Sequence, residues 1–339
     1  MRRSAAGSRT RLGALLLGTA VGLAGPLAHA QASGSAARAG DGRTSVEWLQ
    51  AIRAAAQRSN YTGTIVYQHG DEVRSSHIVH FFDGSAPRER VLTLDGRPRE
   101  FIRQGDEVQC LYPKLHRVVI EQAGPHATFP ALGQVGLSHV LEHYTLTVGD
   151  IERVAGIDCR VLDLVPRDAL RYGYKLWVEP TSGLLLKVQV VGRESTVVEQ
   201  IAFSDVRIGQ PIDAAELKAS WSTAGWEVVR HPSHQIELSR QGWSITAPEG
   251  FNRLTEVERH LGNDSQQTAL QAVYSDGLAT VSVFIEPGAA LSDPEPLQHR
   301  GPWSAFMRRV GDARVTVVGE VPPATAQSIA ESVHYVAAH

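Results

Sequence analysis

The chain lacks the sequence signatures of the common catalytic sites. It has no G-x-S-x-G elbow, which would mark a serine hydrolase, and no glycine-rich loop that could cradle a phosphate. Most of its acidic residues fall at turns, as Asp83, Asp95 and Asp106 do, where a short acid favours the turn itself. We therefore predict that the protein is not an enzyme and needs neither a cofactor nor a metal.

Cysteine is scarce, with Cys110 and Cys159 as its two occurrences, both on strand-like stretches. In an oxidising compartment the two thiols could pair and close a loop of about fifty residues, which would stabilise the fold by about 3–4 kcal/mol. Two free, buried cysteines fit the pattern equally well. The sequence leaves both alternatives open.

A hydrophobic run occurs only at the start of the chain. MRRSAAGSRTR carries four arginines and no acid, LGALLLGTAVGLAG follows, and Ala28-His29-Ala30 is an A-x-A site. This order of charged, apolar and small residues is typical of a secretory signal peptide, and the run is too short to span a bilayer comfortably. We expect residues 1–30 to be removed near Ala30, which gives a soluble exported protein. An uncleaved membrane anchor is the alternative.

Positive charge is also in deficit. Removal of four of the 33 Lys and Arg residues leaves 29 against 36 Asp and Glu, a formal net charge of −7. This balance argues against nucleic acid as a partner.

About 300 mature residues exceed what one hydrophobic core usually holds, so two domains are expected. We predict a flexible tether over 31–43, a large β domain over 44–212, a linker over 213–235 and a small α+β domain over 236–339. Each of these segments differs from its neighbours in composition or in hydrophobic period.

The large domain should open with a helix and continue as antiparallel strands. Thr44-x-x-Glu47 is a capping box, and Trp48, Ile52 and Ala55 share one helical face. The period then changes to two, with tight turns at Gly-Asp and Asp-Gly pairs. The predicted strands cover 62–70, 73–84, 88–96, 98–106, 107–113, 143–154, 158–166, 172–180, 184–192 and 196–206. A sheet of ten strands tends to curl, and curling over a helix would leave a concave apolar inside.

The small domain should combine strands with one closing helix. Strands are predicted over 241–251, 267–277, 278–287 and 313–322, and a helix over 324–336 after Pro322-Pro323. The best-defined piece is the hairpin YSDGLATVSVFIEPG, Tyr274 to Gly288, which turns at Asp276-Gly277.

Two short stretches carry residues that could act at a site. His139-Val140-Leu141-Glu142-His143 matches H-x-x-E-H, the pattern of some zinc peptidases. Such a site needs a longer helix and a third ligand downstream, whereas Tyr144 already begins a strand pattern. A short amphipathic turn is the simpler interpretation, and a zinc hydrolase remains a remote alternative.

The second stretch is RYGYKLWVEP, in which Arg171, Tyr172, Tyr174 and Trp177 could be contact residues on an exposed face. A strand with one packed side and one wet side explains the same pattern.

Several longer stretches resemble the RseB/MucB family of periplasmic regulators. They are Tyr61-Thr62-Gly63, REFIRQGDEVQCLYP, DCRVLDLVPRDALRYGYKLWVEPTSGLLLKV, AVYSDGLATVSVFIE and VTVVGEVPPATAQSIAESV. The patterns YSDGL-x-x-x-SV and VVGE-x-PP-x-T are the most specific, and the resemblance covers nearly all of residues 44–336. The sequence departs from the family mainly in the long segment PHATFPALGQVG.

The resemblance implies a fold and a function. The fold is mainly β: a half-open antiparallel β-barrel wrapped around helices, similar to lipoprotein carriers, followed by a small α+β domain. The function is to bind the periplasmic segment of a transmembrane anti-sigma factor of RseA/MucA type and shield it from site-1 proteolysis. This restrains an envelope-stress sigma factor until lipid or lipopolysaccharide fragments release the regulator. A periplasmic lipid or lipoprotein carrier is the alternative, and a homodimer stays open.

The resemblance also suggests site residues. The expected partner-binding residues are Tyr274, Ser275, Asp276, Gly277, Leu278, Phe284, Glu320 and Pro322. The candidates for a lipid groove are apolar and aromatic residues of the predicted helix and strands, chosen from the sequence pattern: Trp48, Ile65, Val66, Tyr67, Phe81, Phe82, Tyr174 and Trp177. The alternative for the first group is that Tyr274–Gly277 only fixes a hairpin.

Overall fold

The computed structural model describes residues 42–122, 136–260, 268–288 and 298–336. The predicted signal peptide, nearly all of the predicted tether and nearly all of the segment PHATFPALGQVG lie outside these ranges. No helix within them is both long enough and apolar enough to cross a membrane.

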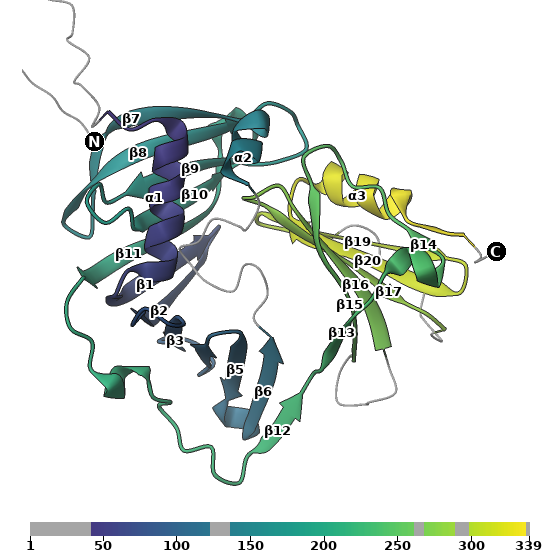
Figure 1. Ribbon diagram of the computed structural model, residues 1–339, viewed down its shortest axis with the longest axis horizontal. Helices are drawn as coiled ribbons and strands as arrows, with labels where there is room; N and C mark the ends of the chain where they lie inside the picture. The colour runs from purple at the N-terminus through teal and green to yellow at the C-terminus, as the bar shows by residue number, and fades with distance from the viewer. Residues whose placement is uncertain (1–41, 123–135, 261–267, 289–297, 337–339) are drawn as a thin grey trace, which may run out of the picture. The chain divides into compact units, whose positions relative to one another are not determined.

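Twelve strands form one large sheet (Figure 1). They are β1 Tyr61–His69, β2 Glu72–Phe81, β3 Arg88–Thr93, β4 Glu100–Gln104, β5 Glu107–Tyr112, β6 Arg117–Gln122, β7 Tyr144–Val154, β8 Ile157–Pro166, β9 Gly173–Val178, β10 Leu185–Val191, β11 Val197–Ile208 and β12 Glu227–Arg230. Their order is β12-β6-β5-β4-β3-β2-β1-β11-β10-β9-β8-β7, so the sheet has two free edges and is not closed. All neighbours are antiparallel except β12 and β6, which are parallel.

Helix α1, Ser45–Arg58, lies across the face of strands β7 to β11 (Figure 1). The predicted capping box is present: Thr44 Oγ1 accepts from the backbone N–H of Glu47 at 3.3 Å, and Glu47 Oε2 accepts from the backbone N–H of Thr44 at 2.6 Å. Trp48, Leu49 and Ile52 are fully buried and pack in one core with residues of β8, β9 and β10. The half-open β domain around a helix is therefore confirmed.

Helix α2, Leu137–His143, has only seven residues and ends where Tyr144 begins β7. Four 3-10 turns complete the helical elements of the described chain: η1 Pro113–Leu115, η2 Arg193–Ser195, η3 Ala214–Leu217 and η4 Leu238–Gln241. We call the twelve-stranded sheet with α1 and α2 the large domain.

The small domain is a seven-stranded antiparallel sheet covered by one helix. Its strands are β13 Ser233–Gln235, β15 Asn252–His260, β16 Thr268–Ser275, β17 Thr280–Glu286, β18 Gln298–Arg300, β19 Trp303–Val310 and β20 Ala313–Glu320, in the order β13-β15-β16-β17-β20-β19-β18. Helix α3, Pro323–Ser332, buries Ala326, Ile329 and Ala330 against this sheet. A short ladder pairs β14 Trp243–Ser244 with β21 His334–Tyr335. The predicted α+β domain with its closing helix is confirmed.

The structure differs from the predicted strands in two respects. The predicted strand over 241–251 is reduced to the two residues of β14. Strands β6, β12, β13, β15, β18, β19 and β21 were not predicted: β15 and β19 carry many polar residues at half-buried positions, and β12, β13, β18 and β21 are each four residues or shorter. The predicted helix over 324–336 ends at Ser332, and β21 occupies part of its range. Strand β12 lies in the predicted linker and extends the large sheet through its parallel pairing with β6.

Both cysteines are free and buried, Cys110 on β5 and Cys159 on β8, with seven strands between them in the sheet order. The structure thus shows the second of the two alternatives. Burial raises the pKa of the Cys110 thiol to about 11 and that of Cys159 to about 12, so neither is a reactive thiolate at neutral pH.

Candidate functional site

The turn between β16 and β17 is held by its own polar side chains. The backbone N–H groups of Leu278 and Ala279 donate to Asp276 Oδ1 at 2.9 and 2.8 Å. Ser275 Oγ donates to the carbonyl of Ala279 at 2.7 Å and accepts from the N–H of Gly277 at 3.0 Å. Gly277 has a φ of +101°, a region that essentially only glycine occupies without strain. Asp276 Oδ1 therefore fixes the turn, and Asp276 Oδ2 makes no hydrogen bond within it.

That second oxygen contacts the large domain. Tyr144 donates its hydroxyl to Asp276 Oδ2 at 2.8 Å, and Arg171 Nη1 lies 3.5 Å from the same oxygen. Tyr144 and Asp276 are fully buried and Arg171 is 3% exposed. Burial, followed by the charge of Asp276, holds the pKa of Tyr144 well above its usual value, so the phenol stays a donor. We call this contact of Asp276 with Tyr144 and Arg171 the joint.

The other guanidinium nitrogens of Arg171 donate hydrogen bonds to neighbouring residues. Nη2 donates to the carbonyl of Glu249 at 2.6 Å, and Nε donates to Asp168 Oδ1 at 3.2 Å. The guanidinium carbon lies 5.0 Å from the ring centre of Phe251. A flat fork of donors suits this arrangement, which a lysine ammonium could not reproduce. A buried ion pair with such hydrogen bonds is costly to break, because each partner left alone is an uncompensated charge.

Three further contacts surround the joint. Leu278 packs against the large-domain core that contains Trp48. Thr325 Oγ1 on α3 donates to the carbonyl of Leu170 at 2.7 Å. Gly250 has a φ of +88°, and a Cβ there would lie 2.8 Å from Arg171 Nη1. The small domain is thus held by an apolar contact, a hydrogen bond and a close backbone approach.

A second group of contacts involves strands β1, β2 and β11. Tyr67 donates to Glu199 Oε2 at 2.8 Å, and Arg300 forms an ion pair with Glu72. Burial, followed by the charge of Glu199, raises the pKa of Glu320 to about 7. Burial also raises the pKa of Glu199. Two carboxyl groups with raised pKa values therefore lie near this contact, and the charge of Glu199 disfavours the ionisation of Glu320.

A cavity of about 1180 Å³ opens beside the joint. Strands β8 to β10 and the loop 192–197 supply most of its wall, and Pro322, Pro323 and Ala324 from the start of α3 complete it. Tyr172 and Tyr174 contribute aromatic surface, and Arg171 lines the cavity as well as the joint. The volume lies slightly above the common range for small-molecule pockets of about 300–1,000 Å³, which leaves room for a long apolar ligand.

One of the eight predicted groove residues lies at this cavity. Tyr174 lines it, and Trp48 is buried in the core cluster that includes Tyr174. Trp177 is buried in the other large-domain core and donates to Glu152 Oε2 at 2.8 Å. The remaining five, Ile65, Val66, Tyr67, Phe81 and Phe82, are half-buried and do not line this cavity.

The predicted partner-binding residues fall into two groups. Tyr274, Ser275, Asp276 and Gly277 are buried and form or support the turn at the joint. Leu278, Phe284, Glu320 and Pro322 are half-buried, and of these Pro322 lines the cavity. The residues missed by sequence reasoning include Tyr144, which bonds the turn, and Gly250, which contacts His143 and Arg171. No local pattern marks them, because their role depends on a contact between segments more than a hundred residues apart.

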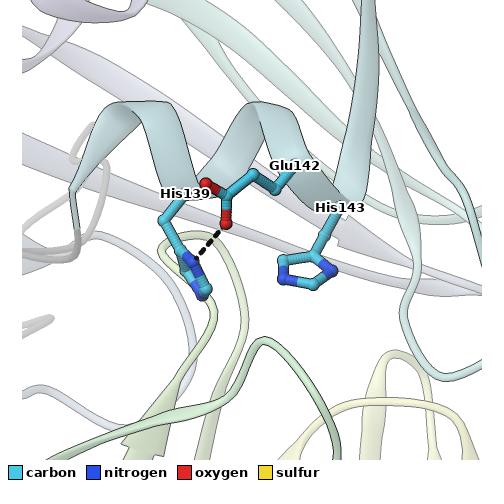
Figure 2. A group of neighbouring side chains, drawn as sticks. All are labelled: His139, Glu142 and His143. Atoms are coloured by element: carbon cyan, nitrogen blue, oxygen red, sulfur yellow. Dashed lines mark hydrogen bonds and ion pairs between the residues drawn. The ribbon is translucent and has the colours of Figure 1, made fainter.

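The H-x-x-E-H motif lies next to the joint on α2 (Figure 2). His139 Nδ1 lies 3.0 Å from Glu142 Oε2, and the two histidine rings are 4.8 Å apart, edge to face. His139 Nε2 lies 2.8 Å from the carbonyl oxygen of Gly250. Burial, followed by the charges of Arg171 and His139, lowers the pKa of His143. Among the described residues this is the one group of three His, Cys, Asp or Glu side chains whose ligand atoms lie close together, all within 4.8 Å, and it includes no ligand from a downstream helix.

The structure is a two-domain β protein. Its large domain is an open sheet with a large cavity, and its small α+β domain contacts the large domain at the joint. Such an architecture is that of a binding protein. Two family models match the chain: the MucB/RseB N-terminal domain over residues 44–221 and the MucB/RseB C-terminal domain over residues 237–334. The chain belongs to the MucB/RseB family, as its motifs predicted.

Curated relatives match along most of their length. The Pseudomonas aeruginosa protein named sigma factor AlgU regulatory protein MucB is 30% identical over 295 residues, which covers 85% of this chain and 90% of that protein. The Escherichia coli K12 protein named sigma-E factor regulatory protein RseB is 26% identical over 292 residues, which covers 86% and 90%. These relatives are named as regulatory proteins.

Solved structures are similar over both domains. One is the complex of Pseudomonas aeruginosa MucA and MucB, with a TM-score of 0.69 and 28% identity over 87% of this chain and 99% of that chain. Another is MucB in complex with MucA(peri), with a TM-score of 0.67 and 28% identity over 87% and 100%. The similarity therefore extends to a protein that has been solved with a bound partner.

Proposed function

We propose that this protein is a regulator that binds the periplasmic segment of a transmembrane anti-sigma factor and thereby restrains an envelope-stress sigma factor. One observation carries the proposal: the chain matches MucB along most of its length, in both sequence and fold, and MucB has been solved with MucA. The binding protein would shield its partner from site-1 proteolysis. It acts by covering a polypeptide and does not turn over a substrate.

The proposed location is the periplasm. The N-terminal arginines, apolar run and A-x-A site support export and cleavage near Ala30. The proposed organisation of the mature chain is a tether over 31–43, a large domain over 44–212, a linker over 213–235 and a small domain over 236–339. The cavity and the joint both belong to this mature part.

An amphiphile that binds in the cavity could release the anti-sigma partner, because the cavity and the joint share residues. Arg171 lines the cavity and holds Asp276, and the residues from Pro322 to Ala324 line it at the start of α3. A ligand that enters can move the partner-bound equilibrium only if it prefers one arrangement of these groups. We propose that a lipid or lipopolysaccharide fragment fits better when the small domain has shifted away from its partner-binding arrangement.

The buried turn has a supporting role in this scheme. Tyr274 to Gly277 have little surface left for a partner, so we propose that they fix the small domain and that more accessible residues such as Phe284 make direct contacts. Partner recognition then depends on both domains at once.

A direct test compares the mature chain with a truncation after Ile212. Each protein is mixed with a labelled periplasmic segment of the cognate anti-sigma factor, and binding is followed by fluorescence anisotropy and by protection from the site-1 protease. We expect the truncation to lose capture and protection. Full affinity in the truncated protein would exclude the small domain as a binding element.

The cavity also favours a second candidate, a periplasmic lipid or lipoprotein carrier. A carrier moves a labelled acyl ligand between donor and acceptor vesicles, whereas a regulator only binds it. Catalysed transfer at protein concentrations far below that of the lipid would support the carrier.

A further inference from the structure

The side chains of His139, Glu142 and His143 project from the same side of α2 (Figure 2). We propose that they bind one divalent transition-metal ion of the zinc class, and that the ion strengthens the contact of α2 with the small domain through His139. The inference is independent of anti-sigma binding, because it rests on the geometry of this helix and of its contacts with Gly250 and Asn252.

The hydrogen-bond partners of His139 determine which ring nitrogen carries hydrogen. The carbonyl oxygen of Gly250 can only accept, and it lies 2.8 Å from Nε2, so Nε2 must carry a hydrogen. Asn252 Nδ2 also lies 2.8 Å from Nε2, and an amide N–H can only donate, so Nε2–H is compatible with this neighbour when the Asn252 amide is turned to present its oxygen. With the amide in that orientation, Nδ1 of the neutral ring presents a lone pair.

That lone pair faces another acceptor. Glu142 Oε2 lies 3.0 Å from Nδ1, and two acceptors at this distance repel unless a proton or a cation lies between them. A proton would make His139 an imidazolium. A metal ion would instead use the nitrogen and the carboxylate as ligands, and would recruit His143 as a third.

The spacing on the helix brings His143 within reach. Residues four apart lie one turn above each other on the same face, so both rings point to one side of α2. The ligand atoms of the three residues all lie within 4.8 Å of one another. Ligand atoms in a tetrahedral zinc site lie about 3.4 Å apart, so rotation of the His143 side chain must close the remaining gap.

Gly250 keeps the space above these rings open. A Cβ at this position would lie 2.6 Å from His143 Nε2, so any other residue would crowd the nitrogen. Around His143, the carboxylates of Asp168 and Glu249 partly offset the positive charge of Arg171.

The donor set selects the kind of ion. Two imidazoles and one carboxylate suit Zn²⁺, and also Ni²⁺ and Cu²⁺, whereas Mg²⁺ and Ca²⁺ prefer oxygen ligands. His139 would donate its other N–H to the Gly250 carbonyl, the arrangement that orients a metal-bound histidine and raises its basicity. The ion would thus stiffen a link between α2 and the loop that precedes β15.

The experiment titrates tag-free mature protein, first freed of metal by chelator, with ZnCl₂ in a calorimeter. We expect one zinc ion per chain and at least tenfold weaker binding in His143→Ala and in Glu142→Gln. Glu142 is 64% exposed, so its substitution leaves the core intact. His334→Ala, at an exposed residue on β21, is the matched control and should bind as the parent does.

Two further measurements make the outcome decisive. Co²⁺ in place of zinc should give the intense visible absorption of a four-coordinate ion, lost in His143→Ala. Zinc should also slow amide exchange over residues 249–252 in the parent but not in His143→Ala. Absence of stoichiometric zinc, or equal affinity in His143→Ala, would overturn the metal site, and unchanged exchange over 249–252 would overturn its effect on the contact.

Discussion

Asp276, at the tip of a hairpin in the small domain, accepts a 2.8 Å hydrogen bond from the hydroxyl of Tyr144 at the first residue of β7, and both side chains are fully buried. The two residues are 132 positions apart in the chain. The hairpin turn therefore connects the small domain to the large domain. This contact gives the acidic residue at the tip of the hairpin a structural role.

Removal of the Asp276 carboxylate should destabilise the protein strongly. Asp276→Ala leaves Asp168 as the remaining ion partner of Arg171, leaves the buried Tyr144 hydroxyl without its acceptor, and removes the acceptor that fixes the turn. We expect a loss of about 3–5 kcal/mol in the free energy of unfolding. Urea denaturation measures the loss, and a change below about 1 kcal/mol would contradict a buried ion pair at the joint.

Tyr144→Phe tests the hydrogen bond with the least disturbance. It removes one donor and keeps the ring, so we expect about 1–2 kcal/mol of destabilisation. Tyr335→Phe is the control, because Tyr335 is 56% exposed and should change stability by less than about 0.5 kcal/mol. Combined with Asp276→Asn in a double-mutant cycle, Tyr144→Phe should show a coupling of about 0.5–3 kcal/mol. Strict additivity would mean that the two residues do not interact in solution.

Gly250→Ala separates crowding at the joint from backbone strain. The new methyl group would meet His143 and Arg171 at 2.6 and 2.8 Å, in addition to the strain of a φ of +88°. Gly225→Ala is a matched control, since Gly225 has a φ of +77° and nothing within 4 Å of its added Cβ. We expect the control to cost about 1–2 kcal/mol and Gly250→Ala to cost clearly more. Equal losses of unfolding free energy in the two variants would show that His143 and Arg171 do not restrict the space at Gly250.

Stability should depend on pH through Glu320. Its pKa is raised from 4.5 to about 7 by burial and by Glu199, so the folded protein favours the protonated acid. The favourable contribution is complete below about pH 4.5 and is lost as pH rises through about 7. Glu320→Gln, which mimics the protonated form, should therefore raise the melting temperature at pH 8 and have little effect at pH 5. The same shift at both pH values would contradict a titrating Glu320.

Filling the cavity should block amphiphile binding without weakening the fold. Val191→Trp places a large ring in the wall of the 1180 Å³ cavity, and we expect at least a tenfold loss of affinity for a fluorescent acyl probe. Val228→Trp, at a position 54% exposed on β12, is the control for the added aromatic ring. Unchanged probe affinity in Val191→Trp would place the lipid site elsewhere.

The regular elements could be predicted because their signals are local. The capping box of α1 and the Asp276-Gly277 turn are each set by residues within a few positions, and both occur as expected. Strand β12 could not be predicted, because four residues pair in parallel with β6 across more than a hundred positions. Its formation depends on an edge that only the folded sheet provides.

The site could be predicted only in part for the same reason. Arg171 and Tyr174 stood out from their aromatic and basic surroundings, and both line the cavity. Tyr144 had no such signal, although it receives the turn, because its partner lies in the other domain. The turn residues were expected to be a surface for another protein, whereas the structure buries them within this one. The sequence pattern therefore identified the turn residues as important, but it did not indicate that they contact the large domain of the same chain.

The most direct test is the affinity of the mature protein for the labelled periplasmic anti-sigma segment, measured by fluorescence anisotropy with and without an amphiphile. We expect tight binding that weakens at least tenfold when the amphiphile is present in the parent and remains unchanged in Val191→Trp. An affinity that the amphiphile does not alter, or no binding at all, would contradict a regulator released through its cavity.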